Sequence, residues 1–117
     1  MTHNEIMAML TESELSVAYD HYAEGESPNP PFICFLYPNT NHFIADGRVY
    51  AKVNAVHVEL YTDEKNPPLE EKLETVLDRY GIVYSKSEVW IADERLYEVL
   101  YTFELEVDPD EEEQDQI

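Results

Sequence analysis

The chain has 117 residues, which is the size of one compact domain with a single core. Its 26 acidic residues against 7 basic ones give a formal net charge of −19, and a field of that sign excludes ordinary binding of DNA or RNA through Lys and Arg contacts. The single cysteine, Cys34, excludes an intrachain disulfide framework.

The acidity is not confined to the end of the chain. Six of the acids follow Val107, so residues 1–107 still carry about −13. Three interpretations stay open: a very soluble protein, a mimic of nucleic acid that binds a basic partner, or the lining of a passage through which DNA slides. No apolar run reaches the ~18 residues of a membrane span, and the first ten residues lack the pattern of a secretory signal, so we expect a cytosolic protein.

The first third of the chain predicts a helix followed by two strands. Residues 4–13 have apolar side chains at helical spacing, and residues 16–22 alternate with period two, as a strand does, although a continued helix is the competing interpretation. A turn-rich connector, 24–31, follows. Residues 32–37 are apolar on both faces, which predicts an interior strand with Cys34 buried and unreactive.

A polar loop, Pro38 to Ala45, interrupts this pattern and leads into Asp46-Gly47. That dipeptide is the strongest hairpin signal in the sequence, because a type I′ turn needs positive φ at both central residues. Strands should therefore flank it. Residues 48–62 are rich in Val and Tyr and predict one long strand, bent near Asn54.

The clearest helix runs from Pro67 to Tyr80. Asn66 is placed to cap it, two prolines fit its first turn, and Gly81 is placed to end it. An apolar stripe at helical spacing predicts the face that packs on the sheet. The stripe consists of Leu69, Leu73, Val76, Leu77 and Tyr80.

Residues 82–91 and 96–107 predict an antiparallel hairpin around the polar turn 92–95. The expected order is α β β β β α β β, an α+β fold with a mixed or antiparallel sheet of about four to six strands and two helices packed on one face. We expect one domain over residues 1–107 and a disordered acidic tail over 108–117.

The residues that usually carry chemistry are not arranged as a site. The four histidines lack the spacing of metal ligands, and the three glycines do not form a phosphate-binding loop. A catalytic carboxyl pair needs burial to separate two pKa values, and the acids to test first are Asp20 and Glu59, because both are interleaved in predicted strands. The sequence therefore predicts no catalytic residues, no metal and no cofactor.

Most of residues 5–107 resembles a known family of small proteins. The resemblance rests on the strings VAYDHYAEGESPNPPFICFL, NHFIADGRVY, VHVELYTDEKNPPLEEKLETVLDRYGIVYSKSEVWI and ERLYEVLYTFELE. The family is encoded in the structural modules of long-tailed bacteriophages and prophages of Gram-positive bacteria. Its members are described as tail completion, tail terminator or head-tail joining proteins. None of the matching pieces is a catalytic motif.

This resemblance implies a non-enzymatic virion protein. Its subunits are expected to form a homo-oligomeric ring, usually hexameric, on the end of the tail tube, to contact the tail tube protein there, and to join the tube to the head connector or head completion protein. DNA would cross the ring without specific binding. The protein would be found in the host cytoplasm during assembly and then in the virion tail, with no membrane involved.

The polar loop after Pro38 has a role in this interpretation. It would project and contact a neighbouring subunit or the tube, and Arg48 would reach an acid on the next subunit. The candidate contact residues are Asn39, Asn41, His42, Phe43 and Arg48.

Two alternatives belong to other classes. An acidic inhibitor or regulator that mimics DNA would bind a basic enzyme, and it should spread carboxylates over one convex face. A small hydrolase would instead show a pocket with a perturbed acid or histidine. A ring subunit differs from both because it needs apolar lateral surfaces.

Overall fold

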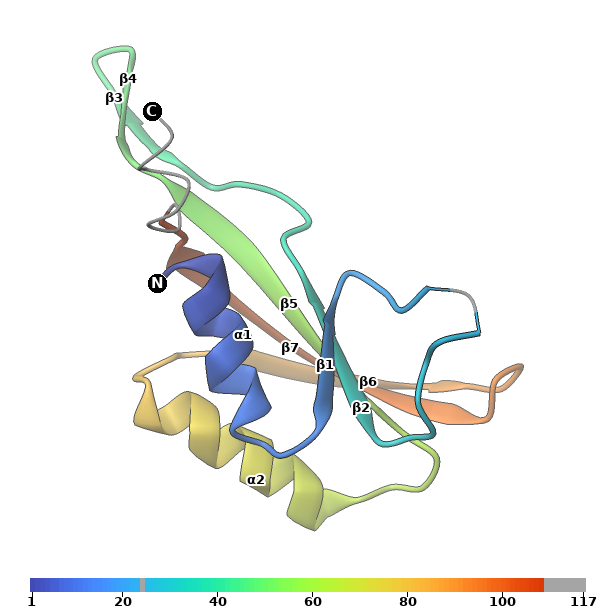
Figure 1. Ribbon diagram of the computed structural model, residues 1–117. Coiled ribbons are helices and arrows are strands. Elements are labelled where there is room, and N and C mark those ends of the chain that lie inside the picture. Colours follow the sequence, from blue (N-terminus) through green and yellow to red (C-terminus); the bar gives the residue numbers. More distant parts are fainter. Residues whose placement is uncertain (24, 109–117) are drawn as a thin grey trace.

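Two helices lie against the same face of one β-sheet (Figure 1). Helix α1 spans His3–Thr11 and helix α2 spans Pro67–Arg79. The structure, a computed structural model, describes residues 1–23 and 25–108. The expected α+β fold with both helices on one face of the sheet is confirmed.

The sheet has five strands in the order β1-β2-β5-β7-β6. They are β1 (Ser16–Tyr19), β2 (Phe32–Leu36), β5 (Val53–Thr62), β7 (Leu96–Glu106) and β6 (Ser85–Ile91). Strands β1 and β2 are parallel and every other neighbouring pair is antiparallel. The central strands β2, β5 and β7 are therefore paired on both sides, while β1 and β6 are the edges.

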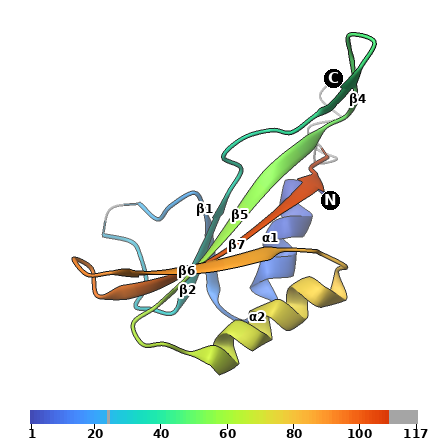
Figure 2. The same ribbon diagram turned by 180° about the vertical axis from the view of Figure 1, so that it is seen from behind.

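A separate two-stranded hairpin projects from this body. It consists of β3 (Phe43–Ala45) and β4 (Arg48–Ala51), and residues 43–51 are called the arm below. Its turn has φ of 53° at Asp46 and 71° at Gly47, so the predicted Asp-Gly hairpin is confirmed. Figures 1 and 2 show the arm at one end of the molecule and the turn between β6 and β7 at the other.

The base of the arm is fastened to the start of β5. The backbone N–H of Asn41 donates to the carbonyl of Val53 (2.8 Å), and the N–H of Ala55 donates to the carbonyl of Asn39 (2.9 Å). The N–H of Val53 also donates to Nδ1 of His42 (2.9 Å), and Nδ2 of Asn41 donates to Glu104 on β7 (2.6 Å). Hydrogen bonds to two strands of the main sheet therefore fix the direction in which the arm leaves the body.

The core lies between the helices and the sheet. Apolar side chains alternate along β2, β5 and β7, and one set from each strand faces the helices. Burying a side chain of this size contributes about 1.5–3 kcal/mol. The fully buried members include Ile6, Met9, Leu10, Ile33, Phe35, Val56, Val58, Leu60, Leu73, Leu77, Val99 and Tyr101.

Both helices begin at a capping residue. The hydroxyl of Thr2 accepts from the N–H of Glu5, whose side chain accepts in return from the N–H of Thr2. Asn66 caps α2 as predicted, because its side chain accepts from the N–H of Leu69. Gly81, at φ 72°, follows the end of α2 in the left-handed conformation that the sequence predicts.

Several predicted boundaries were wrong. The strand expected over 16–22 ends at Tyr19, because Asp20 turns the backbone to φ 65°. The long strand expected over 48–62 is interrupted at Lys52, which separates the arm from β5 and adds one strand to the predicted order. Tyr80, expected in the buried stripe of α2, is 46% exposed, and its hydroxyl donates to Glu12.

The two ends of the described chain meet. The amino group of Met1 donates to the carbonyl of Glu106 (3.0 Å) and pairs with the carboxylate of Asp108 (3.2 Å). Thr2 and Asp108 also form a parallel β-bridge. Asp108, placed by the sequence at the start of a disordered tail, thus makes defined contacts, and residues 109–117 of that tail lie outside the described residues.

A cluster of charges joins α2 to the edge strand β6. Glu70 is buried, although the helical pattern gives no reason to bury it, and its carboxylate pairs with Lys65 (2.7 Å) and Lys86 (2.8 Å). Lys86 also pairs with Glu74 (2.7 Å), which accepts from the hydroxyl of Tyr101 (2.7 Å). Burial alone would raise the pKa of Glu70, but the two lysines outweigh it and hold that pKa below its usual value.

We predict that Glu70→Ala lowers the free energy of unfolding by about 2–3 kcal/mol at pH 7, because it leaves two lysines without their buried partner. Since the folded pKa is lowered, the contribution is complete above the unfolded pKa and is lost as pH falls through the folded one. The difference from wild type should therefore shrink at pH 3. Urea unfolding at both pH values measures it, and Glu71→Ala, at an exposed neighbour, is the matched control.

Candidate functional site

Among the residues that the structure describes, no helix lies on the face of the sheet opposite α1 and α2, which is called the open face. Strand register shows which side chains share it: Cys34 is paired with Glu59, Phe32 with Tyr61, and Glu59 with Leu100. Its members are Ser16, Ala18, Phe32, Cys34, Leu36, Ala55, His57, Glu59, Tyr61, Ser85, Ser87, Val89, Ile91, Leu96, Glu98, Leu100, Thr102 and Glu104. This face therefore mixes apolar and acidic groups.

Part of the open face is covered by the segment that follows β1. The ring of Tyr22 packs edge-on against Phe32, with ring centroids 5.4 Å apart, and its hydroxyl lies 2.5 Å from the hydroxyl of Ser16. Phe32 stacks in turn on Tyr61, with centroids 5.2 Å apart and an angle of 28° between the rings. These rings bury Phe32 and Cys34, although neither faces a helix.

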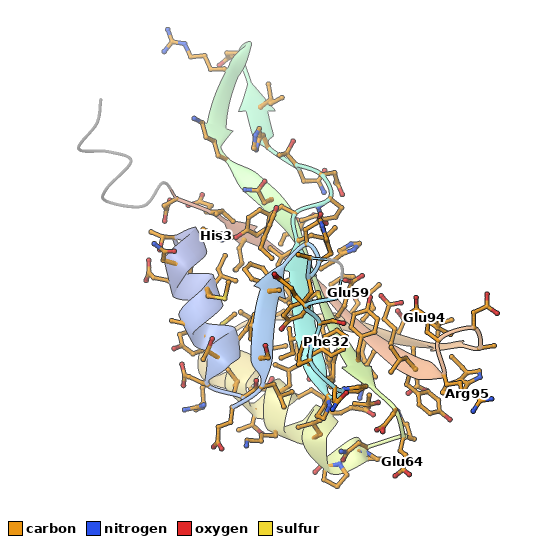
Figure 3. The ribbon with its side chains drawn as sticks, turned by 45° about the vertical axis from the view of Figure 1, so that its right-hand side comes forward. His3, Phe32, Glu59, Glu64, Glu94 and Arg95 are labelled. Carbon is orange, nitrogen blue, oxygen red and sulfur yellow. The ribbon has the colours of Figure 1, made fainter. Side chains whose placement is uncertain are left out.

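Two carboxyl groups meet at the centre of this face. Glu59 on β5 and Glu98 on β7 are diagonal neighbours, because Glu59 is paired with Leu100 and Glu98 with Tyr61. Glu98 raises the pKa of Glu59, so below that pKa Glu59 holds a proton that its carboxyl group can donate to Glu98. The hydroxyl of Tyr61 donates to Oε1 of Glu98 (3.3 Å). Figure 3 shows Glu59 and Phe32 on the middle of the sheet.

The pKa of Glu59 is raised to about 7. The largest cause is burial, followed by the nearby carboxyl group of Glu98 and its charge, while the hydroxyl of Tyr61 acts in the opposite direction. The charge of Asp20 adds a smaller upward contribution. Of the two acids that the sequence singled out, Glu59 is thus perturbed and Asp20 is one of its perturbers.

Cys34 lies across the strand pair from Glu59. Burial raises the pKa of its thiol to about 11, and the charges of Glu59 and Asp20 add to that effect. A thiol with this pKa is almost fully protonated at neutral pH and is a poor nucleophile. The prediction that Cys34 is buried is confirmed, and its unreactive character follows from these surroundings.

Two shallow grooves flank the carboxyl pair. One, of about 440 Å³, lies toward the turn between β6 and β7; its lining includes Asp20, His21, Tyr22, Phe32, Cys34, Tyr61, Ile91, Glu94 and Leu96. The other, of about 450 Å³, lies toward the arm; its lining includes Ala55, His57, Val83, Tyr84, Ser85, Thr102 and Glu104. Glu59 lies on β5 between His57 of one groove and Tyr61 of the other.

Exposed apolar side chains are found on the arm and along the β6 edge. Ile44 on the arm is 62% exposed, and Val89 on the open face of β6 is 51% exposed. Trp90, on the other face of β6, packs against Tyr97 with centroids 4.7 Å apart yet stays 46% exposed. Strand β6 also has no strand on its outer side, so its backbone groups there are available for pairing.

The carboxyl pair determines what the centre of the open face can do chemically. A carboxyl pair that shares a proton near neutral pH can exchange a proton with a ligand or bind a cation in place of the proton. Among the described residues, no group of three or more His, Cys, Asp or Glu side chains is placed to hold a metal ion.

The predicted contact residues fall in two places. Asn39, Asn41 and His42 lie at the base of the arm, where the backbone of Asn39 and the side chains of Asn41 and His42 form the hydrogen bonds to β5 and β7. Arg48 lies on the arm itself and is exposed, and Phe43 begins the first strand of the arm. Contact of these residues with another protein stays a prediction.

Sequence reasoning missed Glu98 and Tyr61 as partners of Glu59. The alternation Leu96, Glu98, Leu100 in a predicted strand placed an acid on an otherwise apolar face, and that was the available signal. The register of β5 against β7, which brings Glu98 beside Glu59, could not be obtained from it.

The fold and the open face are those of an α+β domain with one unpartnered sheet surface. No known family model matches the chain, and no curated protein has a significantly similar sequence. None of the helices in the described part of the chain is long and apolar enough to cross a membrane.

We predict that Glu59→Gln stabilises the domain at pH 8. Because the folded pKa is raised to about 7 from 4.5, wild-type stability falls as pH rises between these values, and glutamine imitates the protonated form. After allowance for partial exposure, the gain should be about 1 kcal/mol at pH 8 and vanish near pH 4. Thermal and urea unfolding measure this gain in the free energy of unfolding. Glu64→Gln, at an exposed carboxyl, is the control and should leave the free energy of unfolding unchanged at both pH values. An equal gain at both pH values would contradict the shared proton.

Proposed function

We propose that this protein is a non-enzymatic structural subunit of a long-tailed phage or prophage, a tail terminator or tail completion protein. Its subunits would form a ring on the end of the tail tube and present a surface to the head connector. The resemblance of residues 5–107 to that family suggests this role, and the shape of the subunit supports it.

The observation that carries the proposal is the placement of two unlike surfaces at different parts of one subunit. The arm projects from one end of the molecule (Figures 1 and 2). It exposes Ile44, while the open face has a groove toward the turn between β6 and β7. Surfaces that differ in this way suit head-to-tail contacts, which close into rings when the rotation between neighbours is right. A two-fold dimer would instead use one self-complementary patch.

The charge of the protein fits a ring that DNA crosses. The net charge of −19 repels the phosphate backbone, so DNA inside such a ring would not adhere to the wall. Lys65, Lys72, Arg79 and Lys86 are moreover paired with acids of the same chain, which leaves few cations for phosphate contacts.

An acidic mimic of DNA is the alternative that the charge alone would allow. Such a protein needs its carboxylates free on one surface, whereas Glu12, Glu14, Glu70, Glu74 and Glu88 pair with lysines or Arg79 of the same chain. Binding to a basic nuclease, with no affinity for tail tubes, would favour this alternative.

We predict that the purified protein caps one end of tail tubes and that Ile44→Asp abolishes capping without unfolding the domain. The substitution places a charge on an exposed apolar position of the arm, where the fold does not depend on it. Negative-stain electron microscopy of tubes counts the caps, and circular dichroism checks the fold. Ala8→Asp, at an exposed position on α1, is the control and should cap normally. Tubes that stay uncapped by the wild-type protein would overturn the proposal.

A further inference from the structure

The basic side chains of this protein fall into two groups. Four of the seven pair with acids of the same chain, as described above. The other three, Arg48, Lys52 and Arg95, form no ion pair with any described residue. Arg48 lies on the arm and Lys52 directly follows it, so residues 43–52 carry two bases and one acid in a protein of net charge −19. Arg48 balances Asp46 within the arm, and Lys52 at its end gives residues 43–52 a net charge of +1 on a strongly negative protein.

The open face offers the complementary surface. Glu59 and Glu98 are diagonal neighbours at its centre, because Glu59 is paired with Leu100 and Glu98 with Tyr61. Around the pair lie apolar side chains that no helix covers, among them Ile91, Leu96 and Leu100. An ordinary solvated acidic surface would keep its carboxylates apart, whereas this face concentrates two of them in a partly apolar setting.

Charge and hydrophobicity thus match between the arm and the open face. The arm carries the exposed Ile44 on one face and the cation of Arg48 on the other, and the open face carries grooves beside two carboxyl groups. The arm leaves the body at the end opposite the turn between β6 and β7, where Glu94 and Arg95 lie (Figure 3). Hydrogen bonds at its base tie it to β5 and β7, and it extends beyond the end of the sheet (Figures 1 and 2).

We propose that the arm docks on the open face of a second copy of this chain and places Arg48 beside the carboxyl groups of Glu59 and Glu98. This inference rests on the proposed function, because it names the partner and the contact that would build the ring. The contact is heterologous, so each subunit gives one arm and receives another.

Docking of Arg48 should release a proton from the carboxyl pair of Glu59 and Glu98. The titratable groups around Glu59 on this face are Glu98 on β7, His57 and Tyr61 two positions away on β5, Cys34 on β2 and Asp20 after β1. A guanidinium beside the pair stabilises its fully ionised form and expels the shared proton. Above pH 7 the proton is already leaving, whereas at pH 6 it must be displaced. Association should therefore strengthen from pH 6 to pH 8, by at most about tenfold per pH unit for one proton released.

Sedimentation equilibrium of the full chain at low salt tests the contact. We expect concentration-dependent self-association at pH 8 that weakens at pH 6 and weakens at least tenfold in Arg48→Glu. Lys72→Glu makes the same change in net charge on the exposed surface of α2 and should associate as the wild type does. Arg48 is exposed on the arm, so its substitution should not affect folding.

A charge exchange makes the test specific. Arg48→Glu and Glu98→Arg should each associate weakly alone, because each brings like charges together at the contact. Mixed in equal amounts, they should assemble again in alternation, since every contact in the mixture then joins opposite charges. Circular dichroism checks that Glu98→Arg is folded, and if it is not, Glu59→Arg takes its place in the mixture.

Three results would overturn the docking contact. They are a wild-type protein that stays monomeric up to about 1 mM at both pH values, an Arg48→Glu variant that associates like Lys72→Glu, and folded variants that fail to assemble when mixed. Failure of the proposed function looks different. Assembly through Arg48 without binding to tail tubes would refute the tail role alone, and tube capping that is unaffected by Arg48→Glu would refute the docking contact alone.

Discussion

Two helices of 9 and 13 residues must cover a sheet whose longest strands have 10 and 11 residues. They suffice for one face, and they bury the alternate side chains of β2, β5 and β7 there. Neither helix would be stable alone at this length, so both depend on the packing that fixes them to the sheet. Neither helix covers the second face, and no other helix among the described residues does so. The carboxyl pair lies on that face, with the arm beyond one end of the sheet and β6 at its edge.

The open face explains why the pKa of Glu59 is raised, whereas the pKa of Glu70 on the helix side of the sheet is lowered. Most carboxylates of this protein are exposed or paired with a lysine, as in the cluster that ties α2 to β6 through Glu70 and Lys86. Glu59 has no such partner and is enclosed by Tyr61, Cys34 and a second carboxyl group. Glu70 of α2 thus lies beside two lysines on the helix side of the sheet, whereas Glu59 of β5 lies beside Glu98 on the open side, and their pKa values are shifted in opposite directions.

Local chemistry determined which features could be predicted from the sequence. The cap at Asn66, the left-handed Gly81 and the Asp46-Gly47 turn follow from the conformations that single residues prefer, and all three are present. The break at Lys52 carries no such signal, because the residues on both sides favour strands equally.

The candidate site depends on register, which only the folded chain defines. Glu59 could be picked out as an acid interleaved in a strand, but its pairing with Glu98 joins positions 39 residues apart. The burial of Glu70 likewise needs Lys86 from another element, so a pattern that counts apolar residues misses it.

The hydrogen bonds at the base of the arm have a geometric consequence. Because Asn41 is tied to both β5 and β7, the arm leaves the body as a stiff extension and not as a loose tether. A stiff projection can meet a neighbour at one angle only. If the arm joins successive subunits, that angle sets the curvature of the assembly, and with it the number of subunits needed to close a circle and the width of the opening at its centre.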